Sequence, residues 1–200
     1  MKKLFIVLIL VSLTIVSCSV IKSFENLARL KYKIDSATDY RILGINISGK
    51  RSLKDFTSVE MLKLTAGFIK GTLPLNFTLN IEAKNPGQYD NSIDTKDITL
   101  AKFPYKLFLN DKEIIQGDIE KPVYIPAGGS SIIIPLRVEF DIVKSFKEKS
   151  LDDILLLLLQ AGGVSGSTSN IKLKVKPALG TPVGIIPYPD EITIADKTFN

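Results

Sequence analysis

Few residue types in this 200-residue chain could carry out catalysis or bind a metal ion. Histidine is absent, and cysteine occurs once, at position 18. Histidine is the commonest general base near neutral pH and the commonest metal ligand, so its absence removes most hydrolytic and metal-dependent mechanisms. A single cysteine also excludes an intramolecular disulfide and a thiolate metal cluster. We therefore expect a protein that is not an enzyme and that holds no metal and no cofactor.

The acidic residues that could do chemistry are better explained by structure. Asp152 and Asp153 are adjacent, and adjacent positions of a helix do not face each other as paired acid–base catalysts must. Both carboxylates favour a helix N-terminus. Asp90, Asp94 and Asp97 could bind Ca²⁺ from a loop, but their spacing lacks the EF-hand pattern. We predict helix capping for the first pair and a solvated loop for the other three.

Two glycine-serine segments, at residues 128–130 and 165–167, could suggest a phosphate cradle or a nucleophile. Neither opens a helix in a βαβ context, and no histidine is present to activate a serine. We predict that both are turns.

The lone cysteine closes an apolar N-terminal segment. Two lysines precede an apolar run from Leu4 to Val16, which is the arrangement of a secretory signal. The run ends in the residues IVSC, which resemble the lipobox of bacterial lipoproteins. The resemblance implies cleavage after Ser17, diacylglycerol on the Cys18 thiol and, in many cases, acylation of the new amine. Two or more acyl chains make such an anchor stable.

An uncleaved transmembrane helix is the alternative, because the apolar stretch from Leu4 to Ile21 is about long enough to span a bilayer. With the lipoprotein reading, residues 1–17 are the signal peptide, 18–26 the lipidated tether and 27–200 one folded domain. The location is then a bacterial cell-envelope membrane, and Ser19 is compatible with the outer membrane where the host has one.

The charge of the chain is mildly basic. Removing Lys2 and Lys3 and acylating the new amine lowers the formal net charge from +5 to +3. This positive charge is small, and the sequence has neither an aromatic-basic stacking motif nor a helix-turn-helix pattern. We therefore expect that the protein does not bind nucleic acid.

Six basic residues could form a stripe if the first and last long strands are neighbours. Such a stripe could bind anionic lipid headgroups. Alternatively, it is a solvated outer face whose lysines discourage edge-to-edge aggregation. They are Arg29, Lys31, Lys33, Lys172, Lys174 and Lys176.

Alternating apolar and polar residues predict a mainly β fold. The clearest strand begins at Leu73 and ends before the turn residues 85–87. A hairpin is expected to turn at Asn110-Asp111, and Pro135 predicts an edge or bulged position in its strand. Further strands are expected around residues 30–34, 40–49, 130–140, 170–177 and 191–194.

One segment, Leu151 to Gln160, predicts a short late helix that begins at a Ser150–Asp153 capping pair. The expected fold is an immunoglobulin/fibronectin-like antiparallel β-sandwich of about seven or eight strands with this one helix. Leu155, Leu156 and Leu159 either close the core between the sheets or line an apolar cavity that holds an acyl chain.

The order of motifs resembles the late embryogenesis abundant type 2 family, whose domain is also called WHy. The matching features lie between Leu27 and Ile194: YRILGINISG as a first hairpin, a strand ending in Asn85-Pro86, then YKLFLND, Gly117, IPAGGS and a strand with an IPL step. Gly87 stands where family members commonly have asparagine. The resemblance implies a β-sandwich associated with desiccation and stress protection, with lipid or membrane contact in related domains. It implies no catalytic residues.

Two functions follow from these observations. The first is a non-enzymatic, membrane-anchored envelope lipoprotein whose domain acts in stress protection or binding, with the membrane as its partner through Cys18. The alternative is a carrier of lipid or another apolar ligand. An envelope hydrolase is a third hypothesis, which the missing histidine disfavours.

Overall fold

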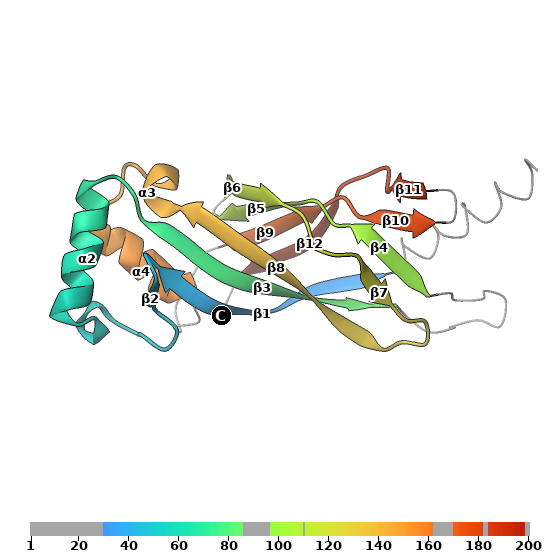
Figure 1. Cartoon of the computed structure of the whole chain (residues 1–200), viewed down its shortest axis with the longest axis horizontal. Helices are drawn as coiled ribbons and strands as arrows, with labels where there is room; N and C mark the ends of the chain where they lie inside the picture. The colour runs from blue at the N-terminus through green and yellow to red at the C-terminus, as the bar shows by residue number, and fades with distance from the viewer. Residues whose placement is uncertain (1–29, 86–96, 110, 162–169, 182–183, 199–200) are drawn as a thin grey trace, which may run out of the picture.

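The computed structural model describes residues 30–85, 97–109, 111–161, 170–181 and 184–198, which form three antiparallel sheets of four strands (Figure 1). Sheet A contains, in order, β2 (Ile45–Asn46), β1 (Lys31–Ile42), β3 (Pro74–Lys84) and β8 (Ser131–Asp141). Sheet B contains β11 (Gly184–Pro187), β10 (Ala178–Thr181), β4 (Ile98–Lys102) and β7 (Val123–Ile125). Sheet C contains β12 (Ile192–Thr198), β9 (Asn170–Val175), β5 (Tyr105–Leu109) and β6 (Lys112–Gly117).

Sheets B and C follow each other end to end, because β4 leads into β5 and β9 leads into β10. A proline interrupts each passage, Pro104 in the first and Pro177 in the second, and proline donates no ladder hydrogen bond. The Lys176 N–H donates to the Pro104 carbonyl oxygen at 2.9 Å and bridges the break. The buried side chains of all three sheets form one hydrophobic core. The mainly β, antiparallel sandwich expected from the sequence is confirmed.

β3 lies between β1 and β8 and supplies the middle of sheet A. Its alternate residues are buried as the sequence pattern predicts, from Leu75 to Ala83. Among the described strands, β8 pairs with β3 alone, so Pro135 lies on an edge strand, as expected.

The first two predicted strands are one strand. β1 runs through both, and the chain then reverses at Leu43 and Gly44, which have φ angles of 49° and 77°. Positive φ at both central residues is the pattern of a type I′ hairpin turn, so YRILGINISG does fold as a hairpin. The second hairpin, β5–β6, is also confirmed, and Asp111 adopts a φ of 61° in its turn. The described residues form twelve strands, more than the seven or eight expected, because short strands such as β2 and β7 are included.

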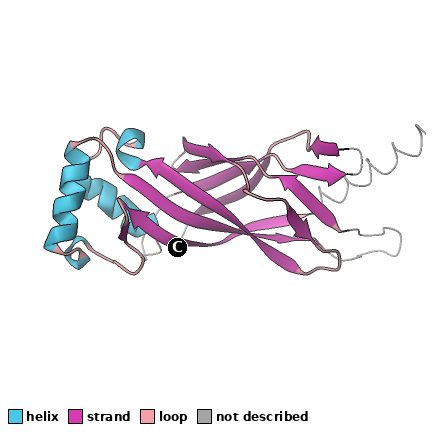
Figure 2. Cartoon of the chain, viewed as in Figure 1, coloured by secondary structure: helices cyan, strands magenta, loops and turns pink. Residues whose placement is uncertain are grey.

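The helices gather at one end of the sandwich, and β1 begins at the other end (Figures 1 and 2). α4 (Leu151–Ala161) is the helix that the sequence predicts, and α3 (Ile142–Ser145) precedes it. The 3-10 turn η1 (Leu53–Asp55) and helix α2 (Ser58–Ile69) lie between two predicted strands, where the alternation of apolar and polar residues predicts no element. The described residues therefore contain more helices than the single one expected.

Within the described ranges, no helix combines the length and the apolar character needed to cross a membrane.

Candidate functional site: an apolar cleft and an exposed helix face

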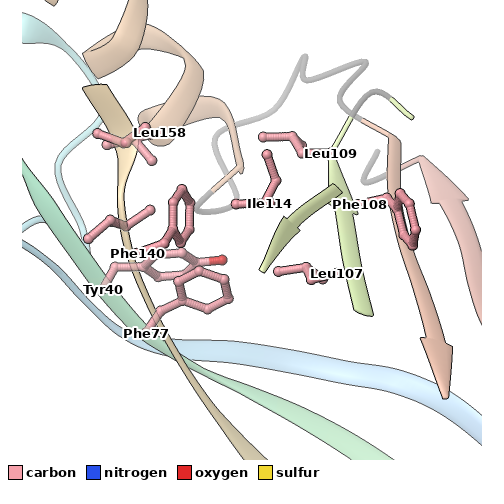
Figure 3. Close-up of a pocket in the computed structure, with 10 residues that line it drawn as sticks. Tyr40, Phe77, Leu107, Phe108, Leu109, Ile114, Phe140 and Leu158 are labelled. Atoms are coloured by element: carbon pink, nitrogen blue, oxygen red, sulfur yellow. The ribbon is translucent and has the colours of Figure 1, made fainter. Parts of the chain in front are cut away.

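An apolar cleft opens between sheets A and C at the helical end of the sandwich (Figure 3). Its volume is about 40 Å³. Sheet A supplies four lining residues, the helices α3 and α4 supply two, and the β5–β6 hairpin supplies four. In that order they are Tyr40, Leu75, Phe77 and Phe140; Ile142 and Leu158; and Leu107, Phe108, Leu109 and Ile114. Such a wall favours alkyl or aromatic groups and excludes charged ones.

Aromatic rings form the sheet A wall. The rings of Tyr40 and Phe77 stack, with centroids 5.0 Å apart and planes 19° from parallel. Burial raises the pKa of the Tyr40 hydroxyl to about 12, so this group stays protonated at neutral pH. It can act as a hydrogen-bonding group but not as a base.

Asp141 fixes the turn from β8 into α3, which sets the position of the neighbouring Phe140 and Ile142. Its carboxylate accepts from the Leu73 N–H at 3.1 Å and from the Val143 N–H at 3.2 Å. The first bond ties β8 to the start of β3, and the second caps α3. This corner of the cleft is therefore held by two backbone N–H groups that donate to the Asp141 side chain.

The leucine-rich helix α4 fills the core with most of its apolar side chains. Leu155 and Leu159 are buried but do not line the cleft, and Leu156 is 43% exposed. Leu158 is the leucine that reaches the cleft. The sequence could not select it, because nearly every face of this helix is apolar.

Several other sequence-predicted residues have structural partners. The Ser150 hydroxyl accepts from the Asp153 N–H at 3.2 Å and donates to its carboxylate at 2.6 Å, so the predicted helix cap is confirmed. The Asp97 carboxylate accepts from the Ala127 N–H at 2.8 Å and from the Tyr124 hydroxyl. These donors lower the pKa of Asp97. It is thus bonded to the IPAGGS turn.

The remaining predicted site residues divide between the sheets and the undescribed segments. Lys31 and Lys33 lie in sheet A, whereas Lys172 and Lys174 lie in sheet C. Lys33 pairs with Glu82 at 2.6 Å and Lys172 with Asp111 at 2.8 Å. The positions that fall outside the described residues are Ser17, Cys18, Arg29, Asp90, Asp94 and 165–167. Among the described residues, no three aspartate, glutamate, cysteine or histidine side chains lie close enough together to hold a metal ion.

Helix α2 presents a second apolar feature. Val59, Leu62 and Ile69 are 63%, 70% and 78% exposed, and they are three of the seven large hydrophobic residues exposed in the described part of the chain. Leu64 and Gly67 form the opposite, buried face. Isolated exposed apolar residues are ordinary, whereas these three lie on one face of one helix, which makes that face a candidate interaction surface.

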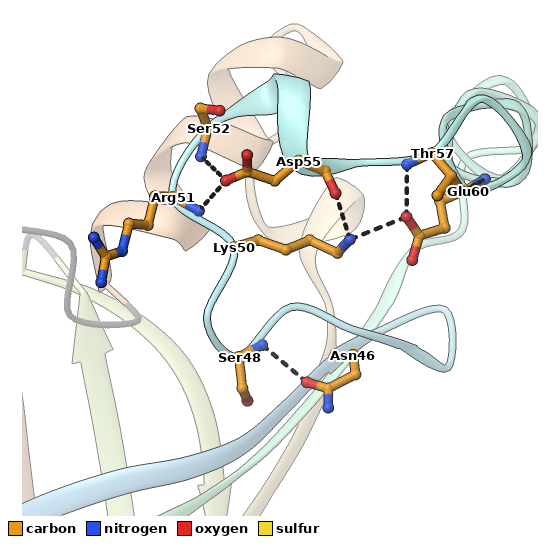
Figure 4. Close-up of polar contacts among 8 residues, drawn as sticks. All are labelled: Asn46, Ser48, Lys50, Arg51, Ser52, Asp55, Thr57 and Glu60. Carbon is orange, nitrogen blue, oxygen red and sulfur yellow. Dashed lines mark hydrogen bonds and ion pairs between the residues drawn. The ribbon is translucent and has the colours of Figure 1, made fainter.

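A polar network fixes the start of α2 (Figure 4). The Thr57 N–H donates to the Glu60 carboxylate at 2.8 Å, and the Glu60 N–H donates to the Thr57 hydroxyl at 3.2 Å. The Lys50 ammonium donates to that carboxylate at 3.0 Å and to the Asp55 carbonyl oxygen at 2.7 Å. The same ammonium lies 4.7 Å from the centroid of the Phe56 ring. Thr57-x-x-Glu60 is a capping box, the sequence signal that would have located α2.

Comparison with known proteins gives no family. No protein-family model matches the chain, and no curated protein matches it. Among solved structures, a crystal structure of a protein from Archaeoglobus fulgidus is similar, with 17% sequence identity and a TM-score of 0.36. The similarity covers 59% of this chain and 80% of that one.

Proposed function

We propose that the chain is a lipid-anchored, non-enzymatic protein of a bacterial envelope whose β-sandwich acts in binding or stress protection. The observation that carries the proposal is the lone cysteine at the end of an apolar leader, in the residues IVSC. A thiol at that position serves attachment, because acyl chains on it supply stable membrane binding. The resemblance to the WHy domain supports the stress-protection role.

The arrangement of the sandwich agrees with attachment at one end. β1 begins at the end opposite the helices, while the cleft and the exposed face of α2 lie at the helical end. A chain tethered ahead of β1 therefore presents both apolar features away from its attachment point. The absence of histidine from the sequence supports a binding role over a hydrolytic one.

Lipidation is tested by expressing the full chain in a bacterium with a palmitate analogue in the medium. We expect label in the membrane fraction and a mature N-terminal peptide that begins at Cys18 and carries diacylglycerol, identified by mass spectrometry. Cys18→Ser removes the only thiol and is the matched control. An unmodified Cys18, or label that persists in Cys18→Ser, would disprove the anchor.

Stress protection is tested separately by drying an unrelated enzyme with and without the protein. Recovered enzyme activity above that obtained with an equal mass of serum albumin supports the protective role. Turnover of an ester or peptide substrate that survives exhaustive purification would instead support the hydrolase hypothesis.

The cleft favours a second candidate function, the binding of an apolar ligand. Ligand pockets usually measure about 300–1,000 Å³, so a cleft of about 40 Å³ accepts the end of an alkyl chain rather than a whole lipid. A complete acyl chain is larger than this cleft, and β5, which carries three of the lining residues, is paired on both sides by β9 and β6. This difference in size ranks the lipid carrier behind the anchored binding protein.

Native mass spectrometry of residues 19–200, purified without detergent, tests this second candidate. Leu109→Asp places a charge at the half-buried edge of the cleft, and Leu156→Asp is the control because Leu156 is exposed outside it. A lipid-mass adduct that only Leu109→Asp removes, with the circular dichroism spectrum intact, supports ligand binding. A bare protein mass rejects it.

A further inference from the structure

The exposed face of α2 has the spacing of a coiled-coil seam. Its apolar residues Val59, Leu62, Ala66 and Ile69 are separated by three, four and three positions, and all four are exposed. This is the a/d pattern of a heptad repeat, narrower than the stripe with which a surface helix usually faces its own core. We call these four residues the α2 seam. Its spacing suits another helix.

The α2 seam is held in a fixed orientation from behind. A Cβ atom on Gly67 would lie 2.8 Å from the Leu73 Cδ2 atom and 3.0 Å from the Thr72 carbonyl oxygen, so the helix approaches its neighbours as closely as glycine permits. The fully buried Leu64 occupies the same inner face. Rolling the helix to hide the seam would expose Leu64. The seam is therefore preformed, which lowers the entropic cost of binding.

Lysines flank one side of the α2 seam. Lys63 and Lys70 occupy the e positions of the heptad when Val59 is position a, and both are exposed. Neither forms an ion pair with any described residue. Residues at e and g choose the partner of a coiled coil through charge. Acidic residues on the partner helix complement these lysines.

A second copy of this chain is a poor occupant of the α2 seam. In an antiparallel pair of helices the e positions face each other, which would set Lys63 against Lys70 of the other copy. In a parallel pair they face the g positions, here Ser58 and Thr65, and no charge is matched. The charges therefore favour a different, acidic helix over self-association.

The position of α2 also disfavours the membrane that holds the anchor as the occupant of the α2 seam. This argument rests on the proposed function. β1 has 12 residues and spans about 40 Å at about 3.3 Å per residue. α2 lies at the end of the sandwich opposite the start of β1, so about the length of that strand separates the α2 seam from the residues that follow the anchor.

From the spacing, rigidity and charge of this face, we propose that the α2 seam docks an amphipathic helix of a partner protein whose apolar a/d residues are flanked by acidic side chains.

Fluorescence anisotropy with a synthetic helix tests the proposal, using the full chain in nanodiscs of zwitterionic lipid. The probe is a labelled peptide of about 21 residues, three heptads with leucine at a and d and glutamate at e and g. The glutamates prevent the peptide from pairing with itself. The comparison peptide carries lysine at e and g. We expect the acidic peptide to bind at least about tenfold more tightly, with affinity falling as salt rises.

Variants of exposed residues assign the site. Leu62→Ser combined with Ile69→Ser should abolish binding, while Leu156→Ser, an exposed leucine on α4, should leave it unchanged. Lys63→Glu combined with Lys70→Glu should reverse the preference between the two peptides. Unchanged thermal unfolding of each variant confirms that folding is intact.

Several results would overturn the proposal. The first is equal binding of both peptides, or acidic-peptide binding that survives the serine variants. The second is sedimentation of the nanodiscs with phosphatidylglycerol vesicles that depends on Leu62, which would identify a second membrane as the occupant. The third is a dimer that Leu62→Ser dissociates.

The N-terminal mass measured on the same sample separates this proposal from the anchor. A chain without lipid on Cys18 that binds the acidic peptide rejects the anchor alone. A lipidated chain that binds neither peptide rejects the docking helix alone.

Discussion

The hydroxyl of Tyr105 in β5 donates to the backbone carbonyl of Arg137 in β8 at 2.8 Å, and this hydrogen bond joins sheet C to the edge strand of sheet A. Gly117, the cross-strand partner of Tyr105 in β6, makes the reach possible. A Cβ atom at Gly117 would lie 2.5 Å from the Tyr105 ring. The absence of a side chain there lets the ring cross β6 toward the other layer.

Gly117→Ala should therefore destabilise the fold. The new methyl group displaces a buried ring, which typically costs about 1–3 kcal/mol, and it pulls the hydroxyl away from Arg137. Tyr105→Phe should cost about 1 kcal/mol, the usual net value of one hydrogen bond. Urea unfolding of both single variants and the double variant measures these costs. Because the two residues touch, the costs should not add; a Gly117→Ala variant as stable as wild type would contradict this account.

Tyr32→Phe should raise stability. The Tyr32 hydroxyl is buried and has no hydrogen-bond partner among the described residues, and burial raises the pKa of this group. A buried hydroxyl without a partner costs about 1–3 kcal/mol, so its removal should add about 1 kcal/mol to the free energy of unfolding. Tyr105→Phe is the matched control, since the same change removes a bonded hydroxyl and should act with the opposite sign. A loss of stability in Tyr32→Phe would show that its hydroxyl has a partner.

Two leucines of α4 should respond differently to truncation. Leu158 is 3% exposed and lines the cleft, whereas Leu156 is 43% exposed. Leu158→Ala should lower the free energy of unfolding by about 2–5 kcal/mol, the range for buried leucines. Leu156→Ala should cost less than about 1 kcal/mol. Similar losses from both changes, measured by urea unfolding, would show that α4 packs in another orientation.

Strand alternation and turn chemistry account for the part of the fold that the sequence predicts. The buried positions of β3, the left-handed Asp111 and the edge position of Pro135 each follow from a local rule. The union of two expected strands into β1 does not, because pairing along β3 keeps the strand continuous through its irregular positions near Ser36 and Thr38. α2 was missed although its capping box is local.

The candidate site was less predictable than the fold. Tyr40, Phe77 and Phe140 occupy inward or edge positions that read as ordinary core in a strand pattern. Their role in a cleft depends on how far sheets A and C separate at the helical end, which is set by packing between segments distant in sequence. The choice of Leu158 over its neighbours on α4 likewise depends on the rotation of that helix.

The Glu60 carboxylate should make stability depend on pH through the start of α2. The Thr57 N–H, followed by the Lys50 ammonium, lowers the pKa of Glu60 below its ordinary value of 4.5. A folded-state pKa below the unfolded value contributes stability that is fully present above the unfolded pKa and is lost as pH falls through the folded pKa. Glu60→Gln removes the titrating group. Its thermal midpoint should lie below that of wild type at pH 7, and the difference should shrink toward about pH 3.

Glu148→Gln is the control for this measurement, because Glu148 is exposed and forms no ion pair with the described residues. Its thermal midpoint at neutral pH should equal that of wild type. Since the Lys50 ammonium also bonds the Asp55 carbonyl oxygen, Lys50→Met should lower the midpoint at pH 7 and reduce the effect of Glu60→Gln made on top of it. An effect of Glu60→Gln that is constant from about pH 3 to about pH 7 would show that packing, not charge, fixes this end of α2.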